Sequence, residues 1–498
     1  MGIVIRQSIK GTVVTYTGAF IGFISTLFIF THLLTPEEIG LQRIIIEAGL
    51  MLGGLAQLGT SSLGIRFFPH FKSEDGKNNG FLLYLATFPL FGILFFFTAF
   101  LVFKVPVSNY FSENSELFID YYYYIFPLAA AYVYQIVFST YANSLMRIVV
   151  PRITQEILIR LVLLAGVLLY HFKIISLDGL VLSTVIAYML AMLVNFFYLF
   201  KIGTVSFRRT KGFVTPELRN KMINYMLYLL AISLMGILSS RIDIFMVSAK
   251  IGLAFTAVYS IAYYVAAIIE MPSRSVSAIV SPIIAAAIKE DDKKTLKTIY
   301  DKVAINQYLF GMLIFLVLWI NIDNLFSFIP NGDFYNQGKY VVLFIGLSKL
   351  VEAAFSLSST ILSYSKYYRY SVLFTIIYGV AIVLSNNWLI PALGITGAAV
   401  ASLGVIFIFR LFYTLFVWYK SKVHPFSWEL LLISGMLLSG ICIDMLLPEL
   451  QNIYLDAFIR TVTVMGCICA IIYFTKISVE VNSIIDRVLK TVRRYIKR

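Results

Sequence analysis

The sequence predicts an all-α polytopic membrane protein with about 14 membrane-spanning helices. Of its 498 residues, 59% are hydrophobic and only 13% are charged, whereas soluble domains carry about 25% charged residues. Apolar runs of about 20 residues, long enough to cross the hydrocarbon core of a bilayer, recur along the chain. Lysine and arginine gather in alternate connecting loops, a distribution typical of helices that cross the membrane back and forth.

The predicted spans follow one another with short connections. In order, they cover residues 9–34, 41–65, 79–103, 118–146, 154–172, 179–200, 222–248, 252–288, 303–321, 338–364, 370–390, 394–419, 427–446 and 456–475. The eighth span is longer than a bilayer requires, and we expect it to tilt or to extend into the cytoplasm. Of the 40 lysines and arginines, 29 lie on the side of the N-terminus and five lie in the opposite loops or at the adjoining span edges. Since basic residues accumulate in cytoplasmic loops, we predict that both termini are cytoplasmic.

Several function classes are disfavoured by the same features. The net charge of +14 comes from short loops that set the topology, so we expect no binding of nucleic acid. The longest predicted outer loop, around residues 321–337, is too short for a folded catalytic domain, and the sequence has no G-x-x-x-x-G-K-[ST] motif. We therefore predict no enzymatic activity and no cofactor. Cys442, Cys467 and Cys469 lie in apolar runs, and the four histidines are scattered, so we expect no metal site.

The C-terminal residues 477–498 differ in kind from the predicted spans. Apolar residues would occupy one face of a helix here, and arginines and lysines would supply the rest. This pattern predicts a basic amphipathic helix on the anionic inner leaflet of the membrane. A solvated, charged helix end is the alternative.

Two weak internal similarities suggest a repeat. LTPEEIGLQRII begins at Leu34 and LAFTAVYSIAYY at Leu253, 219 residues later, while LDGLVLSTVIAY begins at Leu177 and ITGAAVASLGVI at Ile395, 218 residues later. The agreement predicts two parallel six-helix halves around a central cavity. We assign residues 1–205 to the first half, 206–221 to a cytoplasmic linker, 222–422 to the second half, 423–476 to two additional helices and 477–498 to the tail.

Four stretches carry a resemblance to a known family: LTPEEIGLQ at 34–42, RIDIFMVSAKIG at 241–252, MPSRSVSAIVSPIIAA at 271–286 and LIPALGITGAAVAS at 389–402. Over residues 5–475, the chain resembles the Wzx-like polysaccharide flippases of the MOP superfamily, which also contains the MATE exporters and the lipid II flippases. The resemblance implies a transporter in the bacterial inner membrane that works by alternating access.

The cargo implied by this resemblance is a polyprenyl-diphosphate-linked oligosaccharide, such as a repeat unit of O-antigen lipopolysaccharide, capsule or exopolysaccharide. It would move from the inner to the outer leaflet, in contact with membrane lipids, with proton or sodium coupling left open. A cation-coupled small-molecule exporter of the MATE type and a lipid II flippase are the alternatives.

Charged residues inside the predicted spans are the candidate site. A charge at the bilayer centre costs about 2.5–3.5 kcal/mol, so each should face a cavity or a partner. Because guanidinium and ammonium groups bind phosphate oxygens, the candidate ligands of the diphosphate are Arg241, Arg274, Arg160 and Lys349. An interhelical salt bridge is the alternative role for Arg241. Pairing within one helix is the alternative for the other three, with Glu270, Glu156 and Glu352 as the respective partners.

The candidate groups for a coupling ion are Asp243, Glu352 and Glu47. Arg241 and Asp243 are two residues apart, about 200° around a helix, and cannot comfortably pair with each other. Each therefore needs a partner on another helix, or water. Asp243 has no cation one turn away on its own helix, and we place it first among the three carboxylates. Pairing with a distant arginine is the alternative role for Asp243.

Overall fold

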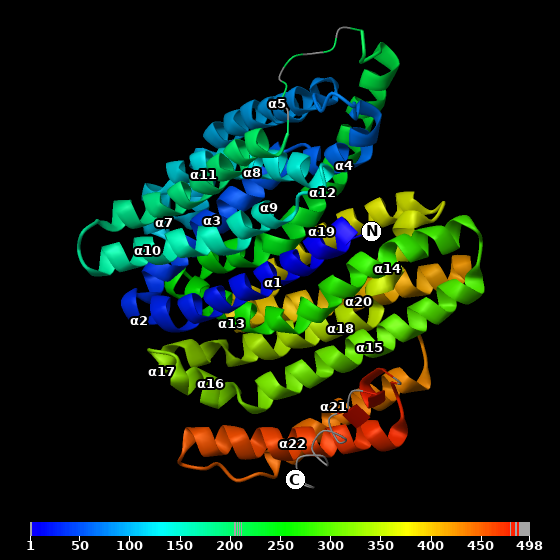
Figure 1. The fold of residues 1–498 in the computed structure, drawn as a ribbon. Helices are drawn as coiled ribbons and strands as arrows, with labels where there is room; N and C mark the ends of the chain where they lie inside the picture. Colours follow the sequence, from blue (N-terminus) through cyan, green and yellow to red (C-terminus); the bar gives the residue numbers. More distant parts are fainter. Residues whose placement is uncertain are drawn as a thin grey trace, which may run out of the picture. The chain divides into compact units, whose positions relative to one another are not determined.

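A computed structural model describes residues 2–203, 206, 208, 210, 212–478, 480–483 and 486–487. Side chains are described for these residues except 2–6, 8–9, 227–240, 274–275, 277–279, 282 and 368. All regular structure in this part of the chain is helical (Figure 1). The chain divides into two compact units: unit 1 contains residues 1–261 and 382–395, and unit 2 contains residues 262–381 and 396–498.

Unit 1 holds the helices of the first half of the chain. They are α1 (Gly2–Ile24), η1 (Ser25–Phe30), α2 (Thr31–Leu33), α3 (Pro36–Ala56), α4 (Thr60–Phe71), η2 (Asn78–Gly80), α5 (Phe81–Val102), α6 (Lys104–Phe111), α7 (Glu116–Asp120), η3 (Tyr122–Tyr124), α8 (Ile125–Ser144), α9 (Val149–Ile153), η4 (Thr154–Leu158), α10 (Ile159–His171), α11 (Leu177–Ile202) and α12 (Pro216–Lys250). Helix α13 (Leu253–Ala267) begins in unit 1 and continues into unit 2.

Unit 2 holds most of the later helices. They are η5 (Ile268–Glu270), α14 (Met271–Lys289), α15 (Lys293–Ile320), α16 (Ile322–Phe328), α17 (Gly332–Tyr335), η6 (Asn336–Gly338), α18 (Lys339–Tyr364), α20 (Ile395–Ser421), α21 (Trp428–Met445) and α22 (Ile453–Thr475). Helix α19 (Tyr368–Leu393) begins in unit 2, and its last turns belong to unit 1.

The predicted fold class is confirmed. Thirteen helices in the described part of the chain are long and apolar enough to cross a membrane. The predicted seventh span, 222–248, lies within α12, a 35-residue helix for which part of the side chains is not described. The chain is therefore an all-α integral membrane protein.

Two predicted spans are interrupted. The span predicted at 41–65 is split into α3 and α4, because Leu58 and Gly59 adopt positive φ angles of 50° and 71° between them. The long span predicted at 252–288 is divided into α13 and α14 by the 3₁₀ turn η5, and Pro272 lies in the first turn of α14. A proline lacks the N–H that a continuous helix needs, which accounts for the break at this position.

Ordinary capping explains one of the stretches that carry the family resemblance. Thr35 caps α3: its hydroxyl accepts a hydrogen bond from the N–H of Glu38 at 3.3 Å, and the Glu38 carboxylate accepts one from the N–H of Thr35 at 2.8 Å. Pro36 occupies the first turn, where its missing N–H has no cost. The letters TPEE therefore specify the start of a helix. Thr215 also caps α12, its hydroxyl accepting a hydrogen bond from the N–H of Leu218 at 3.2 Å, with Pro216 in the first turn and without a reciprocal carboxylate.

Each unit has its own apolar packing. In unit 1, α8 packs against both α3 and α11, and α10 packs against α11 (Figure 1). In unit 2, α15 packs against α18, α21 and α22, around a buried core of residues such as Phe315, Leu316 and Ile468.

The predicted halves, 1–205 and 222–422, and the cavity between them stay predictions. The tail predicted at 477–498 lies mostly outside the described residues. At its start, Ile477 and Val481 are buried in the core formed by α15, α21 and α22.

Candidate functional site

Arg241 on α12 forms an ion pair with Glu47 on α3, and these two helices pack against each other. Only 4% of the Glu47 side chain is exposed, and its Oε1 lies 2.7 Å from Nη2 of Arg43. Two cations thus compensate one buried carboxylate, as burial in a medium of low dielectric constant requires. The expectation that Arg241 has a partner on another helix is confirmed. The interhelical salt bridge considered as the alternative role of Arg241 is present.

Asp243, two residues after Arg241, contacts a different set of helices. Its Oδ1 accepts a hydrogen bond from Nδ2 of Asn386 at 2.6 Å, and its Oδ2 accepts one from the hydroxyl of Tyr259 at 3.1 Å. Asn386 is fully buried on α19, and Tyr259 is fully buried on α13. Three helices therefore meet at the Asp243 carboxylate. The two neighbouring charges of α12 thus have partners on different helices, as their separation around the helix predicts.

Arg160 lies one turn from its partner on the same segment. Its Nη2 is 3.2 Å from Oε2 of Glu156. Glu156 belongs to η4, a π-helical turn between α9 and α10. A Cβ atom on Gly18 of α1 would overlap the Glu156 carbonyl, so α1 approaches this turn closely. π turns within α-helices are frequent at functional positions, and this turn sets the ion pair beside the first predicted span.

In unit 2, Lys349 and Glu352 of α18 lie at the centre of a four-residue ionic network. Nζ of Lys349 is 2.8 Å from Glu270 and 3.0 Å from Glu352. Nη2 of Arg410, on α20, is 2.8 Å from the other oxygen of Glu352, and Nη1 donates to the hydroxyl of Ser359 at 2.9 Å. The predicted pairing of Lys349 with Glu352 is confirmed, and Glu270 and Arg410 extend it to α20 and to the turn before α14.

A kink in α18 lies immediately beyond this network. Phe355 has φ and ψ angles of −115° and 15°, outside the helical range. The hydroxyl of Ser358 donates to the Phe355 carbonyl at 2.6 Å, which satisfies a backbone group near the bend. The ionic network is thus carried by the straight part of α18.

The charges of these clusters balance. Unit 1 combines Arg43, Arg160 and Arg241 with Glu47, Glu156 and Asp243, and unit 2 combines Lys349 and Arg410 with Glu270 and Glu352. The side chain of Arg274, the remaining predicted ligand, lies outside the described residues. Arg241, Arg160 and Lys349 are thus each already paired with at least one carboxylate.

Three residues that contact charged side chains were not predicted from the sequence: Asn386, its neighbour Asn387, and Tyr259. A signal for the two asparagines was available, because adjacent amides within an apolar run need hydrogen-bond partners when the run is a membrane helix. For Tyr259 no such signal existed, since tyrosines are frequent throughout the chain. No group of three or more His, Cys, Asp or Glu suited to a metal ion occurs among the described residues.

Comparison with known proteins identifies the fold. Over 94% of this chain and 100% of the other, the structure is similar to the inward closed conformation of the lipid II flippase MurJ, with a TM-score of 0.71 and 14% identity. The chain has the fold of the MOP transporters.

Other MOP structures are similar over most of their length. An inward-facing multidrug resistance MATE transporter of the MOP superfamily matches with a TM-score of 0.58 and 16% identity, over 85% of this chain and 95% of that one. A MOP transporter from Pyrococcus furiosus matches with a TM-score of 0.53 and 15% identity, over 84% and 95%. The sequence model of the MatE family matches residues 229–388. No curated protein matches the sequence.

Proposed function

We propose that this protein is a flippase that moves a polyprenyl-diphosphate-linked oligosaccharide from the inner to the outer leaflet of a bacterial cytoplasmic membrane. The observation that carries the proposal is the set of arginines and lysine held by carboxylates inside the membrane helices of a MOP fold. No bond of the cargo is made or broken, so the protein acts as a transporter and not as an enzyme.

Partner exchange is the chemical basis of the proposed cycle. The diphosphate carries more charge than a carboxylate and presents oxygens that a guanidinium binds through two hydrogen bonds. It competes with Glu47 for Arg241 and with Glu270 and Glu352 for Lys349. Ion pairs that hold the transporter in one conformation are thereby replaced by contacts with the cargo. The cargo therefore binds the two conformations of the transport cycle with different affinities.

The same exchange provides a route for ion coupling. A carboxylate displaced from its cation inside the membrane gains stability by taking up a proton or a sodium ion. Glu47 and Glu352 are such groups. Asp243, which accepts hydrogen bonds from Asn386 and Tyr259, is the third candidate for coupling.

The prenyl chain of the cargo requires apolar surroundings, which surrounding lipid supplies. Unit 2 also has a cavity of about 370 Å³ between α15, α18 and the start of α21. Tyr308, Leu350, Phe355, Phe426 and Leu430 are among the residues that line it. These mostly apolar walls suit the prenyl chain and, among the described residues, lack the cations that a diphosphate needs. The cavity would therefore bind the prenyl chain, and the ionic clusters would bind the diphosphate of the same cargo molecule.

A MATE-type exporter of small molecules is the second candidate, and the match of the MatE family model to residues 229–388 favours it. Such an exporter would carry cationic compounds on its carboxylates and would have no need of Arg241. A lipid II flippase is a variant of the first candidate with a different cargo, and the similarity to MurJ favours that variant.

The test is transport in proteoliposomes with a fluorescent lipid-linked oligosaccharide. Arg241→Ala should lower cargo affinity roughly 10- to 150-fold, because it removes charged hydrogen bonds worth about 1.5–3 kcal/mol. Arg241→Lys should restore part of the transport, since an ammonium group lacks the planar fork. Arg219→Ala is the matched control, because Arg219 is an exposed arginine on the same helix.

The outcomes separate the candidates. Failure of the wild-type protein to expose the cargo on the far side, in vesicles where a known flippase succeeds, would exclude the flippase. Export of cationic dyes that is indifferent to Arg241→Ala would support the MATE-type exporter. Preference for lipid II over other lipid-linked oligosaccharides would assign the cargo to the lipid II variant.

A further inference from the structure

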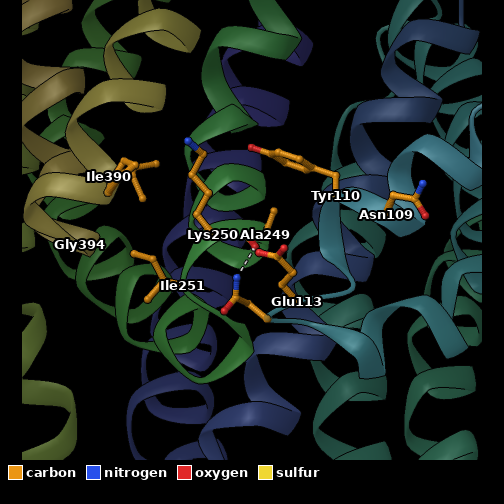
Figure 2. A pocket seen from close by; sticks show the side chains of 10 residues that line it. Asn109, Tyr110, Glu113, Ala249, Lys250, Ile251, Ile390 and Gly394 are labelled. Atoms are coloured by element: carbon orange, nitrogen blue, oxygen red, sulfur yellow. Dashed lines mark hydrogen bonds between the residues drawn. The ribbon is translucent and has the colours of Figure 1, made fainter.

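A pocket of about 520 Å³ lies where three helices of unit 1 end (Figure 2). Asn109 and Tyr110 of α6 line it, with Glu113 and Asn114 of the loop that follows. The last residue of α12, Lys250, lines it from another side, and the end of α19 lines it from a third. We call it the outer pocket, because all three segments lie in loops or helix ends that the distribution of basic residues places outside the cell.

The walls of the outer pocket are fixed by hydrogen bonds. Nδ2 of Asn114 donates to the carbonyl of Ala249 at 3.1 Å, and the hydroxyl of Ser115 donates to the carbonyl of Ser248 at 2.7 Å. Gly252 adopts a φ of 120°, and a Cβ there would lie 3.0 Å from the Asn114 carbonyl oxygen. The loop after α6 is thus held against the end of α12, and the pocket is largely preformed, as ligand sites usually are.

The side chains at the opening suit a polyhydroxylated ligand. Tyr110 projects from α6 toward the side of the pocket where Lys250 stands, and Glu113 lies below both (Figure 2). An aromatic ring packs against the C–H face of a sugar, while amides and a carboxylate bind its hydroxyl groups. Burial raises the pKa of Tyr110, so its hydroxyl stays protonated and can both donate and accept hydrogen bonds.

The electrostatics of the pocket disfavour a phosphate. Helices α6, α12 and α19 end here with the negative ends of their dipoles, while α13 and α20 begin just after the lining residues Ile251 and Gly394 with positive ends, so the side chains decide the preference. Glu113 adds a carboxylate, and the Lys250 ammonium already donates to Asn387, to Oδ1 at 2.6 Å and to the carbonyl oxygen at 3.2 Å. A neutral sugar or an amino sugar is therefore preferred over an anion, in contrast to the arginine and lysine clusters proposed for the diphosphate.

We infer that the outer pocket binds a sugar residue of the transported cargo on the extracytoplasmic side, with Tyr110 as the stacking platform. The inference rests on the proposed flippase function and deepens it. The pocket is also joined to the coupling candidate: Asn387 holds Lys250 at the pocket, and the adjacent Asn386 holds Asp243 about two turns earlier on α12. A bound sugar thus contacts the same pair of helices that positions Asp243.

The experiment is saturation-transfer NMR on the full chain in nanodiscs. The probes are free glucose, galactose, glucosamine and N-acetylglucosamine, with glucose 1-phosphate as the anionic probe. At least one free sugar should give a signal, and Tyr110→Ala should weaken its affinity about tenfold, while Tyr110→Phe keeps most of it. Tyr123→Ala is the matched control, because Tyr123 is an exposed tyrosine at the same predicted membrane side but does not line the pocket.

Charge supplies a second readout. Glu113→Gln should strengthen the glucose 1-phosphate signal relative to glucose and weaken the glucosamine signal. Stronger binding of glucose 1-phosphate than of glucose to the wild type would overturn the charge argument. Absence of signal from every free sugar, or an equal signal in Tyr110→Ala and Tyr123→Ala, would overturn the pocket itself.

Transport measured on the same samples separates the two proposals. Arg241→Ala should lose transport and keep the Tyr110-dependent sugar signal. A wild type that gives this signal but moves no lipid-linked cargo would count against the flippase and leave the pocket standing. A wild type that transports normally without a Tyr110-dependent signal would count against the pocket alone.

Discussion

At the scale of single residues, the membrane charges of this protein are shared among several partners. Glu47 contacts both Arg43 and Arg241, and Glu352 contacts both Lys349 and Arg410. A carboxylate with two cations can release one of them and remain compensated. Under the proposed function, this redundancy would let Arg241 bind the cargo at a smaller cost in stability than a simple buried pair would.

Because Glu47 has two cationic partners, substitutions of Arg43 and Arg241 should have non-additive effects on stability. Arg43→Ala or Arg241→Ala alone leaves Glu47 with one cation, so each should lower stability only slightly. The double variant leaves a buried, unpaired carboxylate and should lose about 3–5 kcal/mol. Thermal unfolding in detergent of the wild type, the two single variants and the double variant measures this non-additivity. Adding Glu47→Gln to the double variant should recover most of the lost stability. Additive effects of the two single substitutions would contradict the shared pairing.

Arg460 gives a second prediction at this scale. Its Nη1 lies 2.7 Å from Asp444 and its Nε lies 2.8 Å from Asp456, and only 11% of its side chain is exposed. Asp456 also accepts a hydrogen bond from Asn324 of α16 at 2.7 Å. Arg460→Ala removes the cationic partner of Asp444 and Asp456 and should lower the free energy of unfolding by about 3 kcal/mol.

Thermal unfolding of the Arg460 variants measures this effect. Arg460→Lys should show a smaller loss, because one ammonium cannot reproduce the two directed contacts of the guanidinium fork. Since Arg460 belongs to a structural contact among α16, α21 and α22, transport by the folded fraction of Arg460→Ala should stay normal. An unchanged melting temperature in Arg460→Ala would contradict a structural role of Arg460.

At the scale of helices, close approach is made possible by glycine at particular positions. A Cβ on Gly40 of α3 would overlap the carbonyl of Leu253, the first residue of α13. Backbone atoms cannot move aside as a side chain end can. The sequence LTPEEIG therefore combines a helix start at Thr35 with a glycine that lets α13 begin against α3.

Gly40→Ala should consequently destabilise the protein by about 1–3 kcal/mol, the usual cost of forcing atoms into a packed contact. Gly404→Ala is the matched control, because nothing lies within 4 Å of a Cβ at that helical position of α20. The control should leave stability unchanged or raise it by about 0.5–1 kcal/mol, since alanine allows fewer backbone conformations than glycine in the unfolded chain. Thermal unfolding compares the two, and equal effects would show that α3 and α13 are not in tight contact.

Most of the helices could be predicted from the sequence, because long apolar runs in a membrane protein have few alternatives to helix. The interruptions near Leu58 and at η5 were missed, since hydropathy does not register backbone dihedral angles. At the site, the need for partners was predictable from the cost of a buried charge, but the partner helices were not. Which helix lies opposite Arg241 depends on packing, and only the structure places Glu47 there and Asn386 at Asp243.

At the scale of the whole chain, the membrane topology decides on which side of the membrane each loop and pocket lies. The assignment of the outer pocket to the extracytoplasmic side, and of the linker at 206–221 to the cytoplasm, follows from the positive-inside rule. The loop between α4 and α5 carries basic residues, whereas the segment after α6 is acidic, with Glu113 and Glu116. One measurement on these two loops therefore tests the orientation of unit 1.

The prediction uses two exposed glutamates, Glu74 in the first loop and Glu116 in α7. In a background in which Cys442, Cys467 and Cys469 are replaced by alanine, Glu116→Cys should react with a membrane-impermeant maleimide on intact cells. Glu74→Cys should react only after permeabilisation. The reverse labelling would place the outer pocket in the cytoplasm, where it could meet the sugars only before transport. Under the proposed coupling through Asp243, the proton or sodium ion would then reach this carboxylate from the opposite side, so the orientation bears on both proposals.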